Sequence, residues 1–177
     1  MVKLKRITSA NSEEYAYVEK LLTSSFPLEE YRNLKQWKEF TDNNKLFNNN
    51  IILDNDKMVG LMTIWDLETF YYIEHFAIDQ NLRSKGYGSK VLNILEKEVD
   101  KPIILEVEIP DNKTACRRIE FYQKYNFTLW MGEYAQPPYR VTETALPMKL
   151  MCRGELTEKE HFKSVVKDLY GKVYSLT

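Results

Sequence analysis

Residues 79–89 combine side chains and backbone features that suit a phosphate group. This segment holds two glycines, Gly86 and Gly88, and two basic residues, Arg83 and Lys85, between an apolar stretch and a helical pattern. Backbone N–H groups at the start of a helix have no partner within the helix and carry partial positive charge. Glycine lets such a backbone approach phosphate oxygens without a Cβ in the way. The segment therefore predicts an anion-binding loop.

Two common phosphate motifs do not fit this loop. A Walker loop needs Gly-Lys followed by Ser or Thr, whereas Gly88 is followed by Ser89 and Lys90. A dinucleotide-binding fingerprint needs a third glycine where Val91 stands. What remains is R-x-x-G-x-G, beginning at Arg83, and this short pattern alone fits an ordinary strand-to-helix turn equally well.

The surroundings of the loop resemble the GNAT N-acetyltransferase superfamily. R-x-x-G-x-G follows the strand-like residues 74–78, as in the acetyl-CoA motif of that family. A second block, with a strand at 103–108, N-x-x-A at Asn112 and Ala115, and an aromatic helix end at 121–127, is similar to the family's second motif. Asn126 stands where the family usually has glycine, and Asn also tolerates a left-handed helix cap. The resemblance covers residues 59–127 well, and the element order extends it over most of the chain.

The resemblance implies an enzyme that transfers the acetyl group of acetyl-CoA to a primary amine of a small cationic molecule or a peptide. The backbones of Phe76 and Ile78 would hold the pantetheine arm, and one of their N–H groups would polarise the thioester. Asn112 would reach the pantetheine, and Tyr122 would protonate the departing thiolate. Residues expected to contact the acetyl donor are Phe76, Ala77, Ile78, Arg83, Ser84, Lys85, Gly86, Tyr87, Gly88, Ser89, Asn112 and Ala115.

The general base and the acceptor site are less sharply indicated. Glu74 is the first candidate for the base and Glu106 is the second. Because side chains alternate along a strand, Glu106 lies on the same face as Glu108. If these carboxylates line the acceptor cleft, they favour a cationic amine; the alternative is a solvated or salt-bridged face. Tyr122 likewise has an alternative, as a core aromatic. Expected acceptor-binding residues are Glu29, Tyr31, Glu108 and Tyr139.

Two other functions remain open at this point. A CoA-binding sensor or regulatory module would use the same loop without turnover. A nucleotide or phosphosugar binder would use it for a different phosphate.

The composition narrows the class of protein. The 177 residues include 25 basic and 26 acidic side chains, a net charge of −1 that disfavours nucleic-acid binding. The longest uncharged apolar stretch, 59–65, is too short to span a bilayer. The first residues do not have the pattern of a signal peptide. We therefore expect a cytoplasmic protein without a membrane partner. Cys116 and Cys152 lie far apart, and no metal site is expected. The chain is expected to act as a monomer or a homodimer.

The pattern of elements predicts a single domain over residues 1–177, with a core at about 3–152 and a C-terminal helix at 157–170. Strands are expected at 2–8, 50–53, 59–65, 70–78, 103–109, 127–134 and 145–152, with turns at 48–50 and 54–57. Helices are expected at about 12–24, 34–41, the stretch up to Val99, 113–125 and 157–171, the last opened by a capping box of Thr157 and Glu160. The fold class is α/β (α+β mixed), with helices on both faces of a mixed sheet. The resemblance implies a mostly antiparallel sheet of six to seven strands. The apolar stripe of the last helix would pack on its own sheet or on a second subunit.

Overall fold

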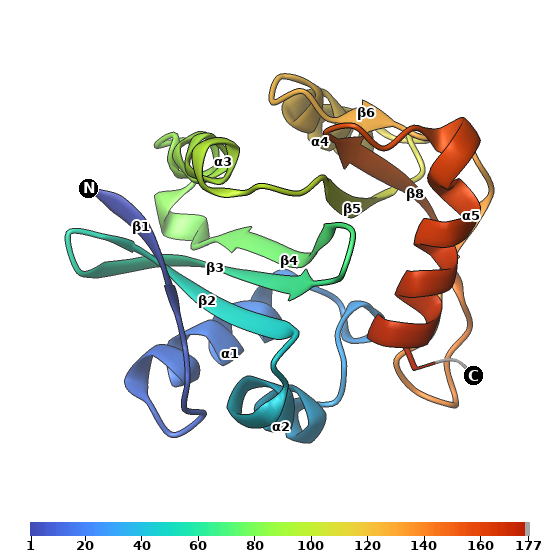
Figure 1. The fold of residues 1–177 in the computed structure, drawn as a ribbon. Helices are drawn as coiled ribbons and strands as arrows, with labels where there is room; N and C mark the ends of the chain where they lie inside the picture. The colour runs from blue at the N-terminus through green and yellow to red at the C-terminus, as the bar shows by residue number, and fades with distance from the viewer. Residues whose placement is uncertain (176–177) are drawn as a thin grey trace. The chain divides into compact units, whose positions relative to one another are not determined.

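The computed structural model describes residues 1–175 and confirms the mixed α/β class (Figure 1). The described chain contains five α-helices and eight strands, one strand more than the sequence pattern predicts. Short 3₁₀ turns occupy Leu28–Glu30 and Gln80–Leu82, and a π-helical turn occupies Leu169–Val173. The elements are, in chain order, β1 Val2–Arg6, α1 Glu13–Ser25, α2 Leu34–Asn43, β2 Phe47–Asp54, β3 Lys57–Asp66, β4 Tyr71–Ile78, α3 Tyr87–Glu98, β5 Ile103–Glu108, α4 Lys113–Gln123, β6 Thr128–Leu129, β7 Tyr134–Gln136, β8 Leu146–Arg153 and α5 Glu158–Asp168.

The chain divides into two compact units. The first comprises Met1–Asp66 and Ile73–Val99, and the second comprises Leu67–Tyr72 and the chain from Asp100 on. Strand β4 thus begins in the second unit and continues in the first. The expectation of a single domain stays a prediction.

The first unit is a sheet with strand order β1-β2-β3-β4. Strands β1 and β2 and strands β2 and β3 pair antiparallel, with Ile51 opposite Leu61. Asn55 and Asp56 turn the β2–β3 hairpin with φ of 47° and 67°, the left-handed values that a tight two-residue turn requires. In Figure 1, α1 and α2 lie on one side of these strands and α3 on the other, which confirms for this unit the expected helices on both faces.

The prediction that residues 48–50 form a turn is wrong, because β2 already starts at Phe47. Asn49 is fully buried, and its side-chain amide donates to Thr41 Oγ1 at 3.0 Å. The Asn50 amide donates to the backbone oxygens of Asn48 and Met62. The side-chain N–H groups of both asparagines thus find partners within the unit, whereas Asn49 Oδ1 has none among the described residues.

In the second unit, β8 pairs antiparallel with β5, β6 and β7. The single strand expected at 127–134 is two short strands, β6 and β7, which accounts for the extra strand. Between them, the backbone N–H of Met131 donates to the Glu158 carboxylate at 3.0 Å. Glu158 also accepts from the amide of Gly132, so a side chain from the start of α5 replaces the strand partner at this point.

The final helix forms as predicted, but its capping box does not. The Thr157 side chain makes no cap hydrogen bond to the backbone, and the Thr157 N–H donates to His161 Nδ1 at 3.0 Å. The ring of Phe162 lies 6.2 Å from that of Trp130, and Val165 is 2% exposed. Val165 and Leu169 of the apolar stripe are therefore buried within their own chain, whereas Phe162 and Val166 are half-buried.

Candidate active site

The loop before α3 has the conformation that an anion-binding turn needs. Gly86 is the N-cap residue of α3 with φ of 76°, and Ser84 also adopts a left-handed φ of 62°. No backbone N–H from Ser84 to Ser89 donates a hydrogen bond to another described residue. These amides stand at the positive end of a helix 12 residues long. The loop therefore presents consecutive unsatisfied donors, as an anion site requires.

The backbone groups at the end of β4 alternate in direction along the strand. A Cβ on Gly60 of β3 would lie 2.6 Å from the carbonyl oxygen of Ala77, so the Ala77 backbone faces β3. The Asp79 N–H also faces β3 and donates to Val59 O at 3.0 Å. Because backbone groups alternate along a strand, those of Phe76 and Ile78 point away from β3. Arg83 Nε donates to the Ile78 carbonyl oxygen at 3.3 Å, which fixes the loop to this strand end.

A cavity of about 290 Å³ lies beside the loop in the first unit. The 3₁₀ turn before Arg83 forms one wall, and the second half of α1 forms the other, bringing Lys20 near the loop. The Tyr17 hydroxyl faces Asp79 Oδ2 at 3.5 Å, and burial together with this carboxylate raises the pKa of Tyr17 to about 12. The lining residues are Tyr17, Lys20, Leu21, Ser24, Ser25, Asp79, Gln80, Asn81 and Arg83.

Glu74 lies in a buried polar network at the middle of β4. Its carboxylate forms an ion pair with Arg32 and accepts a hydrogen bond from Trp65 Nε1 at 2.9 Å. Arg32 is 2% exposed, and its guanidinium lies 4.9 Å from the ring of Phe40 and 5.2 Å from that of Trp65. Burial alone would raise the pKa of Glu74, but the Arg32 charge and the Trp65 hydrogen bond hold it below its ordinary value. Glu74 is therefore a carboxylate with partners on both oxygens.

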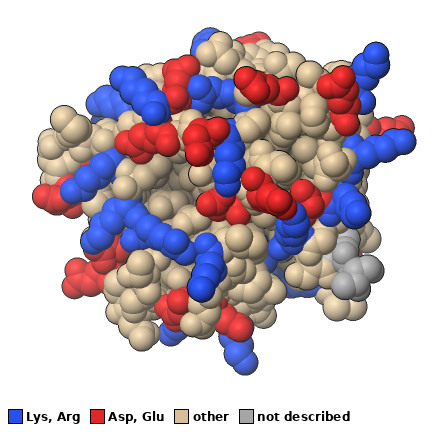
Figure 2. All heavy atoms as spheres, viewed as in Figure 1, with Lys and Arg blue, Asp and Glu red and all other residues tan. Residues whose placement is uncertain are grey.

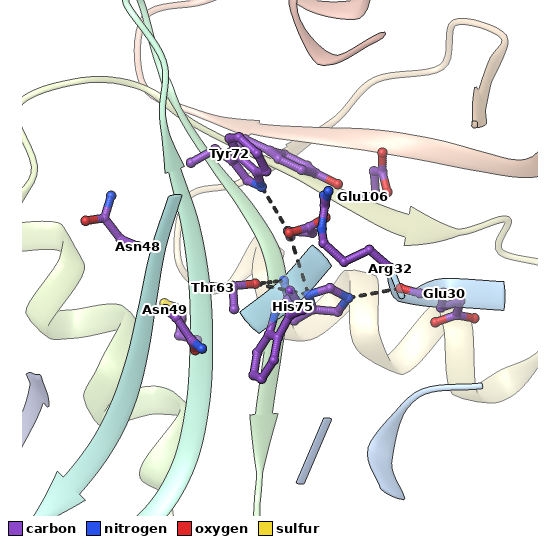
Figure 3. A network of polar contacts seen from close by, with 12 residues as sticks. Glu30, Arg32, Asn48, Asn49, Thr63, Tyr72, His75 and Glu106 are labelled. Atoms are coloured by element: carbon purple, nitrogen blue, oxygen red, sulfur yellow. Dashed lines mark hydrogen bonds and ion pairs between the residues drawn. The ribbon is translucent and has the colours of Figure 1, made fainter. Parts of the chain in front are cut away.

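His75 connects β4 to the segment between α1 and α2. The Thr63 hydroxyl accepts from the His75 backbone N–H at 3.0 Å, so its own proton faces Nδ1 of the ring, also at 3.0 Å. Nε2 then carries the ring proton and donates to the carbonyl oxygen of Glu30 at 2.9 Å, as Figure 3 shows. Burial lowers the pKa of His75 despite the neighbouring Glu74, so the ring is neutral. The contacts of Glu30 and Arg32 connect the segment that holds the predicted residues Glu29 and Tyr31 to β4, with Tyr31 buried and Glu29 exposed.

In the second unit, Asn112 is the N-cap of α4. Its Oδ1 accepts from the backbone N–H groups of Thr114 and Ala115, both at 3.0 Å, and its Nδ2 donates to Asp111. The N-x-x-A spacing is therefore a helix-capping pattern in this structure. Its expected contact with the pantetheine stays a prediction.

Tyr122 lies on the buried face of α4 and is 8% exposed. Its ring packs against Phe121 and Phe127 at 5.4 and 5.5 Å. Burial raises its pKa to about 12; the Arg118 guanidinium opposes this rise and the Glu108 carboxylate adds to it. Tyr122 is thus both a core aromatic and a phenol that keeps its proton at neutral pH. Its neighbour Glu108 is salt-bridged to Arg118 at 2.7 Å.

Glu106 of β5 accepts hydrogen bonds from tyrosines. The hydroxyls of Tyr134 and Tyr174 both donate to it, Tyr174 at 2.9 Å from one carboxylate oxygen and 3.1 Å from the other. The predicted residue Tyr139 stacks on Tyr174 with ring centroids 5.3 Å apart. The structure therefore brings Glu106 and Tyr139 into one cluster within the second unit.

Comparison with known proteins decides the family. Residues 7–127 match the Acetyltransferase (GNAT) family. The chain belongs to the GNAT acetyltransferases. A solved GNAT-family acetyltransferase structure from Bacteroides thetaiotaomicron is 43% identical with a TM-score of 0.96, and the match covers 99% of each chain.

More distant structures share the GNAT fold. The ribosomal-protein-S18-alanine N-acetyltransferase of Escherichia coli is 16% identical with a TM-score of 0.57, over 89% of this chain and 97% of that one. An aminoglycoside 6′-N-acetyltransferase complexed with coenzyme A is 17% identical with a TM-score of 0.61, over 85% and 96%. No protein with a curated description matches the sequence significantly.

The sequence of this GNAT enzyme did not reveal the partners of its carboxylates. Arg32 and Trp65 were missed around Glu74, and Tyr134 and Tyr174 around Glu106. Arg32 is 42 residues from Glu74 and Tyr174 is 68 residues from Glu106, so no local spacing connects them. An excess of tyrosine, 12 in 177 residues, was the one available signal.

Surface and composition add little to the site. On the face shown in Figure 2, basic and acidic side chains are interspersed. Among residues 1–175, no helix is long and apolar enough to cross a bilayer. Within the same range, no group of three or more His, Cys, Asp or Glu side chains could hold a metal ion.

Proposed function

We propose that this GNAT enzyme transfers the acetyl group of acetyl-CoA to the nitrogen of an amine. The observation that carries this proposal is the row of backbone N–H groups from Ser84 to Ser89 at the start of α3, with Gly86 in a left-handed conformation. Such a row matches the diphosphate of coenzyme A in charge and in hydrogen-bond type. Arg83 and Lys85 add full positive charge at the same place.

The backbone of β4 supports the placement of the thioester. Phe76 and Ile78 point their N–H and carbonyl groups away from β3, and the Ile78 carbonyl also accepts from Arg83. The remaining groups of this pair would meet the amide groups of the pantetheine arm. One of the two N–H groups would then polarise the thioester carbonyl. A donor aimed at the developing oxyanion lowers the activation barrier by about 3–4 kcal/mol.

In the transfer step, the neutral amine nitrogen attacks the thioester carbon and a C–N bond forms. The C–S bond then breaks, the nitrogen loses its extra proton, and the sulfur leaves as thiolate or thiol. Tyr122 keeps its proton at neutral pH and would donate it, or a hydrogen bond, to the sulfur. A thiol has a pKa of about 8.5. Because the pKa of Tyr122 is about 12, stabilisation by a hydrogen bond is favoured over complete proton transfer.

The contacts of Glu74 suit a positioning role better than that of a base. Its two oxygens face Arg32 and Trp65, and its lowered pKa makes the carboxylate a weak proton acceptor. We propose that Glu74 holds Arg32 next to Tyr31, and that the acceptor amine loses its proton to water before it attacks. Acceptor contacts by Glu29, Tyr31 and Glu108 remain part of this proposal.

The proposal is tested by measuring CoA thiol release from acetyl-CoA with a panel of amines. We expect release with at least one amine, and a Tyr122→Phe variant should be about a hundredfold slower with an unchanged KM for acetyl-CoA. The half-buried Tyr125, which follows the end of α4, provides the matched Tyr125→Phe control. CoA binding without thiol release would instead indicate a sensor. A thermal shift with ATP and none with CoA would contradict the proposal altogether.

A further inference from the structure

The proposed acetyl transfer makes no use of the cavity beside the loop before α3. This cavity of about 290 Å³ lies between the second half of α1 and the turn after β4, and its lining comes from the first unit alone. Two lining side chains, Lys20 and Arg83, are cations, and one, Asp79, is a carboxylate. The neutral polar groups of the lining are the hydroxyls of Tyr17, Ser24 and Ser25 and the amides of Gln80 and Asn81. The size and the polar lining suit a small, charged ligand.

The two cations of the cavity form no ion pair with any of residues 1–175. Arg83 donates from Nε to the Ile78 carbonyl oxygen, which leaves the terminal nitrogens of its guanidinium for a ligand. Lys20 comes from α1 and Arg83 from the opposite wall, formed by the turn. An anion in the cavity would therefore have positive charge on two sides.

Asp79 does not close the cavity to anions. Its Oδ1 accepts from the backbone N–H and the side-chain amide of Asn81, at 2.9 and 3.1 Å. Its Oδ2 faces the Tyr17 hydroxyl at 3.5 Å. These donors offset part of the negative charge, and the cations of the lining outnumber this one carboxylate. The cavity therefore favours an anion over a cation.

The donors of the lining suit a phosphate better than a carboxylate. A phosphate monoester carries about −1.5 to −2 charges at neutral pH and has three acceptor oxygens, whereas a carboxylate has one charge and two oxygens. The guanidinium fork, the ammonium group and the Ser25 hydroxyl together offer donors to all three oxygens. We propose that this cavity is a binding site for a phosphate monoester, held by Lys20 and Arg83.

Two sources could supply such a group. Coenzyme A carries a phosphate monoester on the 3′ oxygen of the ribose to which its diphosphate is attached, and Arg83 lines the cavity and also begins the R-x-x-G-x-G loop. For this source, the inference rests on the proposed use of acetyl-CoA. The other source is a separate phosphorylated molecule. With either source, the cavity is a second anion site, distinct from the row of backbone amides at 84–89.

The first test compares CoA with dephospho-CoA, which differs by the absence of the 3′-phosphate, in isothermal titration calorimetry. If CoA is the source, it should bind the wild type about tenfold more tightly than dephospho-CoA, as expected for one charge-assisted contact. Lys20→Gln should remove this preference by weakening the binding of CoA and leaving that of dephospho-CoA unchanged. Lys20 is exposed on α1, so this variant should fold. Lys35→Gln removes an exposed lysine of α2 outside the cavity and, as the matched control, should keep the preference.

The second test covers a separate source. Protein loaded with dephospho-CoA is titrated with glycerol 3-phosphate and with glycerate, a carboxylate of similar size, and binding is followed by NMR. If the source is a separate molecule, CoA and dephospho-CoA should bind equally in the first test. Glycerol 3-phosphate should then bind about tenfold more tightly than glycerate, and Lys20→Gln should remove this difference while Lys35→Gln keeps it.

The inference is overturned if neither the 3′-phosphate of CoA nor the phosphate of glycerol 3-phosphate adds affinity. It is also overturned if Lys20→Gln leaves the added affinity unchanged. The proposed acetyl transfer fails in a different way. A preference for CoA that depends on Lys20, without thiol release from acetyl-CoA with any amine, would overturn the acetyl transfer and leave the phosphate site standing.

Discussion

Replacing Glu74 by glutamine tests the buried ion pair at the centre of β4. The side chains of Arg32 and Glu74 are 2% and 0% exposed, so the substitution leaves a guanidinium charge in the interior without its carboxylate. Glutamine keeps the size of glutamate and one oxygen that can still accept from Trp65. The change therefore removes a charge and little else.

The expected loss follows from the burial of both partners. Removing one member of a buried ion pair costs about 3–5 kcal/mol. Since the oxygen facing Trp65 is retained, we expect the lower end, about 3 kcal/mol, in the free energy of unfolding at pH 7. For a chain of this length, such a loss lowers Tm by roughly 6–12 °C. Urea unfolding followed by circular dichroism measures the difference directly.

The pH dependence of the same difference follows from the lowered pKa of Glu74. A group with a depressed folded pKa contributes stability that is fully present above its unfolded value, about 4.5, and is lost as the pH falls through the folded value. The gap in unfolding free energy between the wild type and Glu74→Gln should therefore be constant above about pH 5.5. It should shrink below about pH 4.5, because only the wild type then takes up a proton.

Two outcomes would refute this reasoning. A loss below about 1 kcal/mol would mean that Arg32 is solvated or paired without Glu74. A hundredfold fall in kcat at unchanged stability would restore Glu74 as the general base. The double variant Arg32→Met, Glu74→Gln serves as the control, and it should be more stable than Glu74→Gln alone because no buried charge is left.

Three further outcomes follow from individual residues. Gly60→Ala should lower the free energy of unfolding, measured in urea, by about 1–3 kcal/mol, because the new Cβ meets the Ala77 carbonyl. In Gly86→Ala the new Cβ meets no atom, so the free energy of unfolding should fall by only about 1 kcal/mol, through the φ of 76°. The rate of acetyl transfer should show no alkaline decline between pH 7 and 10, since Tyr122 with a pKa of about 12 stays protonated; a fall in initial rate within that range would contradict its role. Cys152, whose pKa burial raises to about 11, should resist iodoacetamide at pH 8 while the more accessible Cys116 reacts, as peptide mass spectrometry would show.

The parts of the fold that were predicted correctly are those fixed by neighbouring residues. The helix expected from about residue 12 is α1, which Ser12 caps with its Oγ accepting from the Tyr15 N–H. Asn126 adopts the left-handed φ of 63° predicted for a residue in the place of glycine. The interruption between β6 and β7 was not predicted, because it depends on Glu158, which lies 26 residues beyond Gly132.

The candidate site residues also differ in whether they are neighbours in the sequence. The phosphate loop is one contiguous stretch, so its glycines, its charges and the helix that follows were all readable from the sequence. The tyrosines around Glu106 come from β4, β7, a loop and the end of the chain, and carry no spacing relative to it; they are Tyr72, Tyr134, Tyr139, Tyr170 and Tyr174. Sequence patterns could therefore indicate the acetyl donor but not the residues around the second candidate base.

The five tyrosines around Glu106 lie mostly outside the segment that matches the family. The family match ends at residue 127, and it includes the whole phosphate loop and Tyr122. Four of the five tyrosines lie beyond that point, from Tyr134 to Tyr174. If Glu106 selects the acceptor, its specificity is supplied by a part of the chain that the family pattern does not constrain. Exchanging residues 134–174 between related enzymes should then transfer acceptor preference, while the KM for acetyl-CoA stays with the segment up to residue 127.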